Sequence, residues 1–286
     1  MKPMLAATLD NFDDLTYPLI ASPKLDGIRC IAAADDGAPM SRKFEEIPNR
    51  HIYNIFREAH RVFPLTLLDG ELMVPGKDFN GVQSIVMSRD AVSNFEHHVF
   101  DLAYANIPFR ERLTELQSYK LPPWVKIVDQ WEIANLMELI AAEEYCAQAG
   151  YEGIMLRNPE AGYKLGRSTL KEGALMKYKR WYDAEATIVG SVELMLNENE
   201  ATKDAIGHTK RSKKKEGLVP GGTLGALKVQ FFGVTFEVGS GFTDDQRAEY
   251  WSSRDQLPGR VITFKYQELS KKGVPRFPVW LGFRED

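Results

Sequence analysis

The sequence lacks any run of about 18 uncharged apolar residues, which a membrane-spanning helix needs. A secretory signal is also absent, because Asp10, Asn11 and Asp13 stand where its apolar core would continue. Only two cysteines are present, Cys30 and Cys146, which cannot form a framework of disulfides and suit a reducing compartment. These absences predict a cytoplasmic protein with no membrane partner, whose cysteines are small core residues.

An excess of positive charge is missing as well. Lys and Arg number 36 and Asp and Glu number 40, so the net charge of -4 does not by itself indicate a nucleic-acid-binding protein. A hydrophobic content of 44% with 27% charged residues is typical of a globular protein, and 286 residues suffice for about two domains. A basic stripe can lie on an acidic protein, so the positions of Lys and Arg matter more than their sum.

Up to about residue 182, strand-like and helix-like segments alternate. The apolar residues Ile52, Ile55 and Phe56, continued by Ala59 and Val62, recur at helical spacing and predict an amphipathic helix. A second helix is expected over 132–149, ended by a left-handed cap at Gly150. The predicted strands are 19–20, 28–34, 65–74, 98–104, 154–157 and 175–182.

After about Asp183 the pattern changes to five β-type runs and one short helix. Thr243 and Gln246 form a capping box, which predicts that this helix extends to about Tyr250. Five strands with one helix are typical of an OB-type barrel. The fold class is therefore α+β, with two domains, 1–182 and 183–286. The five runs are 186–194, 224–232, 234–238, 261–266 and 277–283.

A polar insertion, 197–222, separates the first two of these β runs. One interpretation is a solvated surface loop that keeps the protein soluble, and the other is an element that orders on a nucleic acid. Its basic residues carry the second interpretation, because each can neutralise a phosphate. They are Lys203, Lys210, Arg211, Lys213, Lys214 and Lys215.

The hexapeptide from Lys24 to Arg29, Lys-Leu-Asp-Gly-Ile-Arg, follows a short apolar segment. A lysine attacks phosphorus only as a neutral amine, so its pKa must fall through burial or nearby cations. Arg29, Lys177 and Lys179 could supply those cations if the fold brings them close. Taken alone, the hexapeptide is equally compatible with a solvated lysine beside a turn.

Two carboxylates stand at the ends of apolar strands. Glu71 follows Asp69-Gly70, and Glu152 precedes Gly153. Such a pair could hold Mg²⁺, which prefers oxygen ligands and substrate phosphates, although each alone is compatible with a solvated strand edge.

Apolar and basic residues alternate over 175–179. Lys177 and Lys179 are therefore predicted on one face of a strand, opposite Met176 and Tyr178. Two cations on one face of a sheet require solvent or an anion, and a phosphate is the natural partner.

Five motifs in this order resemble the motif series of the covalent nucleotidyltransferases, the superfamily of ATP-dependent DNA ligases, RNA ligases and mRNA capping enzymes. The resemblance extends from Lys24 to the end of the chain. It implies an adenylyltransferase domain, 1–182, followed by an OB-fold domain, 183–286. The motifs are Lys-x-Asp-Gly-x-Arg, Asp-Gly-Glu, Phe100-Asp101, Glu-Gly and Lys-x-Lys.

The resemblance also implies a role for each matching residue. Lys24 would be the nucleophile that bonds to AMP, and Phe100 would stack on adenine, where a core phenylalanine is the alternative. Glu71 and Glu152 would be the metal-site carboxylates, with Glu71 also at the ribose. The remaining ATP and AMP contacts would come from Arg29, Arg42, Lys177, Lys179 and Arg284, of which Lys177 and Lys179 would be catalytic together with Lys24.

The segment 276–286 resembles the last motif of the DNA ligases. There, basic residues of the barrel orient the pyrophosphate that leaves ATP. Arg284 is the first candidate for this contact and Arg276 the second. The family pattern often continues with a basic residue after the final Asp, whereas this sequence ends at Asp286.

The resemblance therefore implies an ATP-dependent DNA ligase of the minimal two-domain type known from viruses and some bacteria. It would seal nicks with a 5′-phosphate and a 3′-hydroxyl in duplex DNA, through a lysyl-AMP and a DNA-adenylate intermediate. ATP and Mg²⁺, or Mn²⁺, are expected as cofactors, nicked duplex DNA as partner, and a monomer as the working form. The expected DNA contacts are Arg42, Lys210, Arg211, Lys213, Lys214 and Lys215.

Two alternatives remain in the same superfamily, an RNA ligase and a capping guanylyltransferase. The Leu25 position argues against the latter, because capping enzymes usually have Lys-Thr-Asp-Gly. The DNA-ligase-type end of the chain argues against both. A third alternative, a binding module that has lost catalysis, is disfavoured because Lys24, Glu71, Glu152, Lys177 and Lys179 are all intact.

Overall fold

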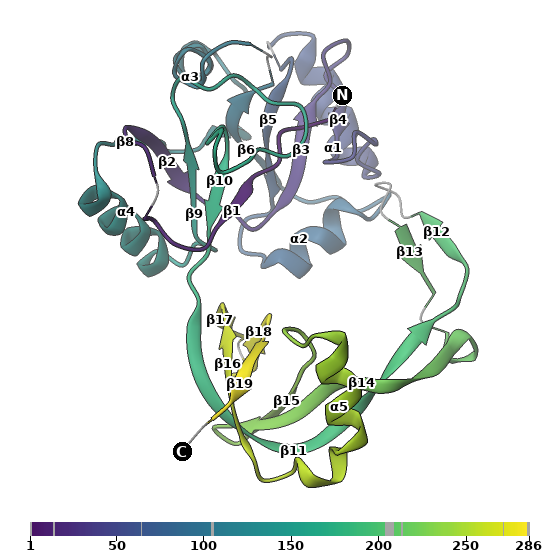
Figure 1. Cartoon of the computed structure of the whole chain (residues 1–286). Helices are drawn as coiled ribbons and strands as arrows, with labels where there is room; N and C mark the ends of the chain where they lie inside the picture. The colour runs from purple at the N-terminus through teal and green to yellow at the C-terminus, as the bar shows by residue number, and fades with distance from the viewer. Residues whose placement is uncertain are drawn as a thin grey trace. The chain divides into compact units, whose positions relative to one another are not determined.

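The computed structural model of the chain describes residues 2–13, 15–63, 65–103, 106–203, 209–212, 214–270 and 272–284 (Figure 1). Two compact units can be distinguished. The first includes Met1–Lys179, and the second includes Arg180–Thr202 and Lys210–Asp286. None of the helices in the described ranges is long and apolar enough to cross a membrane.

The first unit contains two five-stranded sheets. One has the order β1-β10-β9-β2-β8, with β1 parallel to β10 and the other neighbours antiparallel. The other has the order β4-β3-β5-β6-β7. The strands of the first sheet are β1 (Ala7–Leu9), β10 (Met176–Tyr178), β9 (Ile154–Arg157), β2 (Leu19–Pro23) and β8 (Trp131–Ile133). Those of the second are β4 (Pro39–Met40), β3 (Ile28–Ala32), β5 (Leu68–Met73), β6 (Glu96–Leu102) and β7 (Val125–Ile127).

The predicted amphipathic helix is α1 (Arg50–His60), whose Ile52 and Phe56 are buried. Asn49 caps its start, because its side chain accepts a hydrogen bond from the backbone N–H of Ile52 at 3.0 Å. The prediction was wrong for Val62, which lies beyond the helix and is 77% exposed. Helices α2 (Phe79–Val86) and α3 (Phe109–Ser118) were not predicted.

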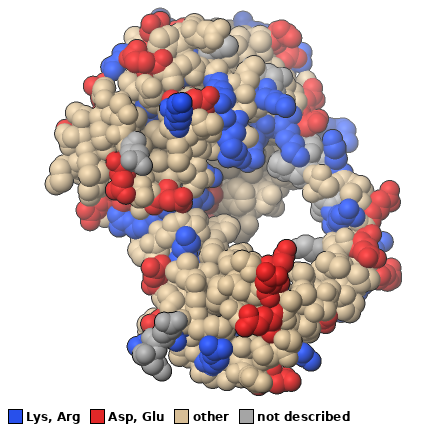
Figure 2. All heavy atoms as spheres, in the orientation of Figure 1, with Lys and Arg blue, Asp and Glu red and all other residues tan. Residues whose placement is uncertain are grey.

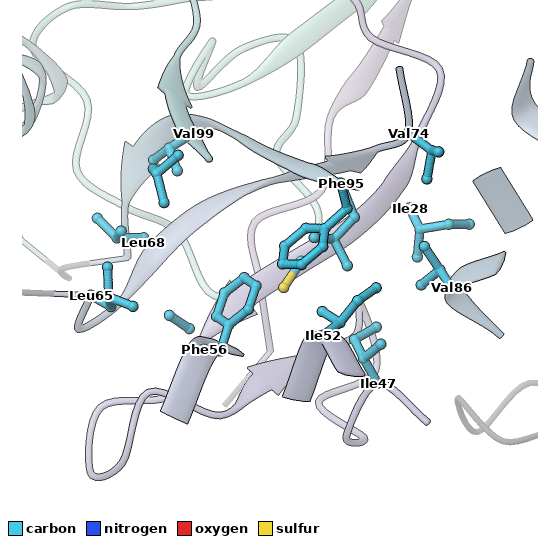
Figure 3. Close-up of a cluster of buried hydrophobic side chains, with 14 of the residues drawn as sticks. Ile28, Ile47, Ile52, Phe56, Leu65, Leu68, Val74, Val86, Phe95 and Val99 are labelled. Atoms are coloured by element: carbon cyan, nitrogen blue, oxygen red, sulfur yellow. The ribbon is translucent and has the colours of Figure 1, made fainter. Parts of the chain in front are cut away.

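Figure 3 shows the larger core of the first unit, in which α1 and α2 contribute Ile52, Phe56 and Val86 against side chains of the second sheet. Burying a side chain of this size stabilises the fold by roughly 1.5–3 kcal/mol. Cys30 belongs to this core, and Cys146 lies in the core of the other sheet. Both cysteines are buried and unbridged, as predicted.

The second predicted helix is α4 (Leu136–Gln148), which begins four residues later than expected. Glu132 and Ile133 belong to β8 instead, where Ile133 pairs with Leu19 and is buried. The pairing of these two residues in the strand prevents the helix from starting there. Asn135 caps the helix instead, because its side chain accepts a hydrogen bond from the Glu138 N–H at 3.0 Å. At the far end Gly150 has a φ of 79°, the left-handed conformation that was expected.

The second unit is built on a sheet of five strands with the order β15-β14-β11-β16-β19. One helix, α5 (Asp244–Ser252), accompanies it and opens with the predicted Thr243–Gln246 capping box. Phe264, Ile188 and Trp280 are among the residues of its core. The prediction of five strands and one helix is confirmed by the main sheet and α5. Its strands are β11 (Tyr182–Asn197), β14 (Leu218–Phe231), β15 (Val234–Val238), β16 (Val261–Tyr266) and β19 (Val279–Phe283).

The predicted insertion is more regular than a loop. Strands β11 and β14 remain paired as far as Asn197 and Leu218, so β14 begins before the predicted residue 224. Beyond this pair lie β12 (Ala201–Lys203) and β13 (Thr209–Arg211), which form a two-stranded sheet, and a 3-10 turn, η1 (Lys215–Gly217). A smaller hairpin of β17 (Glu268–Leu269) and β18 (Pro275–Arg276) precedes β19.

Candidate active site

A pocket within the first unit brings together segments that are distant in sequence. Six of the predicted site residues line it: Lys24, Arg29, Arg42, Glu71, Phe100 and Lys177. The other lining residues are Leu5, Ala6, Ser22, Pro23, Leu25, Met155, Arg157, Arg167 and Leu175. Both sheets contribute, since Lys177 comes from β10 and Glu71 from β5.

Lys24 lies directly after β2, and its backbone is bound to the Glu-Gly motif. Its N–H donates to the Gly153 carbonyl at 2.9 Å, and the N–H of Glu152 donates to the Lys24 carbonyl at 3.2 Å. Gly153 has a φ of 155°, and a Cβ there would lie 2.2 Å from the Tyr178 carbonyl oxygen. Glycine is therefore required where the Glu152 turn meets β10.

The carboxylate of Glu152 is shared by two lysines. Its Oε2 pairs with Lys24 Nζ, and its Oε1 pairs with Lys179 Nζ. All three side chains are largely buried, with exposures between 15% and 19%. In this state both oxygens of the predicted metal ligand accept from ammonium groups.

The two pocket lysines have depressed basicity. Burial lowers the pKa of Lys24, although the carboxylates of Glu71 and Asp26 oppose this effect. Burial also lowers the pKa of Lys177, and the charges of Lys24, Arg167 and Arg42 add to it. Among the residues that the structure describes, Lys177 has no hydrogen-bond or ion-pair partner. A partly buried cation without a partner is suited to bind an anion.

Lys177 and Lys179 are separated from Met176 and Tyr178 in the way the alternation predicted. Met176 and Tyr178 pack in the core of the first sheet. Lys177 faces the pocket, and Lys179 reaches Glu152.

Glu71 is the acidic member of the pocket. It is opposite Arg29 in the register of β3 and β5. Burial raises the pKa of its carboxyl group to about 7, although Arg29 and Lys24 oppose the rise. Its Oε2 is buried without a hydrogen-bond partner in the described structure. An unsatisfied carboxylate oxygen costs free energy, so the site favours a ligand hydroxyl or cation here.

Arg29 is held rigidly by Asp69, which is completely buried. The two guanidinium nitrogens Nε and Nη2 each donate to an Asp69 oxygen at 2.6 Å. The Tyr163 hydroxyl donates to the same carboxylate at 2.6 Å. Such a bidentate pair fixes the orientation of Arg29 at the pocket.

Phe100 lies on β6 with two guanidinium groups over its ring. The Arg29 group is 4.7 Å from the ring centroid and the Arg157 group 5.3 Å. Asp101, which is fully buried, accepts from Arg157 at 2.6 Å and from Arg112 at 2.7 and 3.1 Å. Phe100 is only partly buried and lines the pocket, so the alternative of a core phenylalanine does not fit.

Sequence reasoning missed two arginines of the pocket, Arg157 and Arg167. The signal for Arg157 was its position at the end of the strand that follows Glu152-Gly153. Arg167 had no comparable signal, and its exposed side chain donates to the Ala6 carbonyl at 2.9 Å. Figure 2 shows Lys and Arg side chains gathered over the part of the first unit where β3 lies.

The remaining predicted residues belong to the second unit. Arg284 pairs with Glu185 at 2.5 Å and is about half exposed. Arg211, Lys214 and Lys215 are exposed. Lys213 and the side chain of Lys210 lie outside the described residues.

This combination of fold and pocket defines a nucleotidyltransferase of the ligase class. A family model described as "ATP dependent DNA ligase domain" matches residues 3–179, and one described as "DNA ligase OB-like domain" matches 219–284. The first match covers more than half of the chain. The chain therefore belongs to the family of ATP-dependent DNA ligases, and its function is that of an ATP-dependent DNA ligase.

Individual relatives point to small ligases. The chain is similar to a DNA ligase of Haemophilus influenzae, with 26% identity over 223 residues that cover 76% of this chain and 72% of that protein. It is similar to the crystal structure of the Chlorella virus DNA ligase-adenylate, with 33% identity, 99% coverage of both chains and a TM-score of 0.56. A structure from work on DNA binding by Lig E ligases, described as a minimal scaffold, matches with 26% identity, 99% coverage of both chains and a TM-score of 0.74.

Proposed function

We propose that this ligase seals nicks in duplex DNA through a covalent lysyl-AMP at Lys24. The observation that carries the proposal is a buried lysine of lowered pKa in a pocket lined by cations and one aromatic ring. A neutral Lys24 amine attacks the α-phosphorus of ATP, forming a P–N bond and breaking the bond to pyrophosphate. The 5′-phosphate at the nick then displaces Lys24 from the AMP phosphorus. Finally the 3′-hydroxyl attacks the 5′-phosphorus and AMP leaves.

Each step moves negative charge, so the pocket must mainly position and neutralise phosphates. Lys177 is the candidate for the α-phosphate, because it faces the pocket without a partner among the described side chains. Lys179 acts beside it through Glu152. Phe100 offers its ring to adenine, and Arg29 and Arg42 are the candidates for nucleotide and nick phosphates. Arg284 of the second unit is the candidate for the leaving pyrophosphate.

A divalent ion such as Mg²⁺ fits the donor set only in part. The buried oxygen of Glu71 that lacks a partner suits a cation or a ribose hydroxyl. Glu152 would first have to release Lys24 or Lys179. Within the described part of the chain, no group of three or more His, Cys, Asp or Glu side chains could hold a metal. Phosphate oxygens of ATP would therefore complete the shell, and the ion would neutralise their charge.

The substrate can be tested directly with matched nicked duplexes. With ATP, we expect the protein to seal a 5′-phosphorylated nick in duplex DNA faster than it seals a nick in RNA or in a DNA–RNA hybrid. Sealing of nicked RNA alone would show that the chain is an RNA ligase instead. Covalent uptake of GMP from GTP would show that it is a capping enzyme.

The basic insertion, 197–222, is proposed as a DNA-contacting element. Three of its described cations, Arg211, Lys214 and Lys215, are exposed on a β extension of the second unit. We expect their joint replacement by Ala to weaken binding to nicked DNA and to flatten its salt dependence. Each lost phosphate contact should reduce the slope of log affinity against log salt by about 0.9.

The control for this prediction replaces three other basic residues of the same unit, Lys228, Arg254 and Lys272. Self-adenylylation should be unchanged in both triple variants, because none of the six residues lines the Lys24 pocket or is a candidate for the pyrophosphate. Equal slopes for the wild-type protein and the insertion variant would leave the insertion as a solvated surface element.

The remaining expectations, a monomer that acts in the cytoplasm, are proposed on chemical grounds. Two buried free cysteines suit a reducing compartment, and ATP and nicked DNA are found inside cells. Analytical ultracentrifugation with and without nicked DNA tests the monomer.

A further inference from the structure

One surface of the first unit is apolar and acidic, whereas the charged residues of the pocket are mainly cations. A groove between β8 and α4 is lined by Asp129, Trp131, Glu132, Ile133, Glu138, Ala141, Ala142 and Tyr145. Its apolar part includes an aromatic pair, because the rings of Trp131 and Tyr145 are 6.1 Å apart and nearly perpendicular. Its charged residues are all carboxylates.

Helix α4 has more apolar surface than its own core contacts require. Leu139, Ala142 and Cys146 pack in the core of the first sheet. Met137 and Tyr145 nevertheless remain 75% and 57% exposed: Tyr145 lines the groove, and Met137 lies one helical turn before the lining residue Ala141. Exposed large apolar side chains beside a groove are typical of an interaction surface, and methionine adapts readily to different partners.

The sequence around this groove contains no basic residue. Between Lys126 and Arg157 there is no Lys, Arg or His, whereas the groove is lined by three carboxylates, those of Asp129, Glu132 and Glu138. A polyanion such as DNA would be repelled here. The groove therefore does not serve the substrate of the ligase.

The three carboxylates of the groove differ in how freely they can pair with a ligand. Asp129 is exposed and has no ion-pair partner in the described structure. Glu132 is half exposed and pairs with Arg110 at 2.7 Å, in a contact that solvent weakens. Glu138 caps α4, because its side chain accepts from the Ala134 N–H at 2.8 Å.

We infer that this groove binds a segment of a partner protein in which an apolar side chain is flanked by lysine or arginine. The apolar side chain lies in the groove against the contacting rings of Trp131 and Tyr145, and the basic side chains pair with Asp129 and Glu132. Charge complementarity of this kind gives specificity and fast association. The ligase then contacts its partner on one surface and its phosphate ligands on another.

The test uses a library of displayed dodecapeptides selected on the full-length wild-type protein. We expect the enriched peptides to combine an apolar residue with flanking Lys or Arg. A synthetic, fluorescein-labelled copy should then bind about tenfold or more weakly to Tyr145→Ala and to Met137→Ser, since a central aromatic or apolar contact is commonly worth that much. Asp129→Asn should reduce the salt dependence of binding.

Val62→Ser is the matched control, because Val62 is 77% exposed elsewhere in the same unit. It should bind the peptide as the wild-type protein does. All four variants should seal nicks normally, which separates this site from the active site. The inference fails if no such peptide is enriched, or if the peptide binds Tyr145→Ala and Val62→Ser equally. A dimer of the wild-type protein that Met137→Ser dissociates would assign the groove to a second copy of this chain and would also overturn it.

Discussion

Replacing Lys24 by Ala is expected to abolish covalent uptake of AMP and the sealing of an ordinary nick. The reason is that, in the proposed mechanism, the bond to the α-phosphorus forms at the Lys24 Nζ. Sealing of a nick that already carries 5′-AMP should persist, because the 3′-hydroxyl then displaces AMP without the lysine. The measurements are labelling with radioactive ATP followed by denaturing electrophoresis, and ligation of a pre-adenylylated nick.

The fold should tolerate this change. Glu152 keeps Lys179 as a partner when Lys24 is removed, so no buried carboxylate loses its only ion pair. Lys126→Ala, which alters an exposed lysine of the same unit, is the control and should be labelled like the wild-type protein. Normal labelling of Lys24→Ala would contradict the assignment of the nucleophile.

Local patterns in the sequence predicted much of the fold. The alternation over 175–179 correctly separated Lys177 from Met176, because a strand turns successive side chains to opposite faces. The capping box at Thr243 correctly predicted α5, since the two hydrogen bonds involved are local. Helix α2 escaped prediction because it has only eight residues and includes Gly81, a residue of low helix propensity.

The missed features depend on contacts between distant residues. Helix α4 starts late because β8 pairs with β2, more than a hundred residues earlier. The same holds in the pocket, where Asp101 joins Arg112 and Arg157, and Asp69 joins Arg29 and Tyr163. Motifs give the residues that are proposed to touch the nucleotide, whereas the residues that hold them in position follow from the folded structure.

Glu152 also shows the difference between what a motif predicts and what the folded structure adds. The motif series implied a metal ligand, and the folded chain brings Lys24 and Lys179 to its two oxygens. Neither contact can be inferred from spacing, because the three residues come from different segments. The Glu152 carboxylate can orient Lys24, the proposed nucleophile, and can bind a cation only after one of the two lysines has moved.

The second large effect is expected for the two lysines of the Lys-x-Lys motif, and it should differ between them. Lys177→Ala should slow adenylylation by about 10²–10³, which is the usual effect of removing a charged donor beside a transferring phosphate. Its thermal stability should be unchanged or higher, because burial and the charges of Lys24, Arg167 and Arg42 disfavour the Lys177 ammonium in the folded protein. Lys179→Ala should slow adenylylation and lower stability only slightly, because Glu152 loses one of its two buried ion pairs and keeps Lys24 as a partner.

The pH dependence of the melting temperature separates the effect of Lys177 on stability from its effect on adenylylation. The folded pKa of Lys177 lies below the ordinary lysine value of 10.5, so its charge costs stability at neutral pH. That cost disappears as the pH rises past the pKa that Lys177 has in the unfolded chain, because the amine is then neutral in both the folded and the unfolded state. Any stability gained by Lys177→Ala should therefore be present at pH 7 and fade toward pH 10.5. Melting temperatures across this range, together with single-turnover labelling at pH 7, are the measurements. A Lys177→Ala protein that melts far below the wild-type protein but labels at the normal rate would make Lys177 a structural residue.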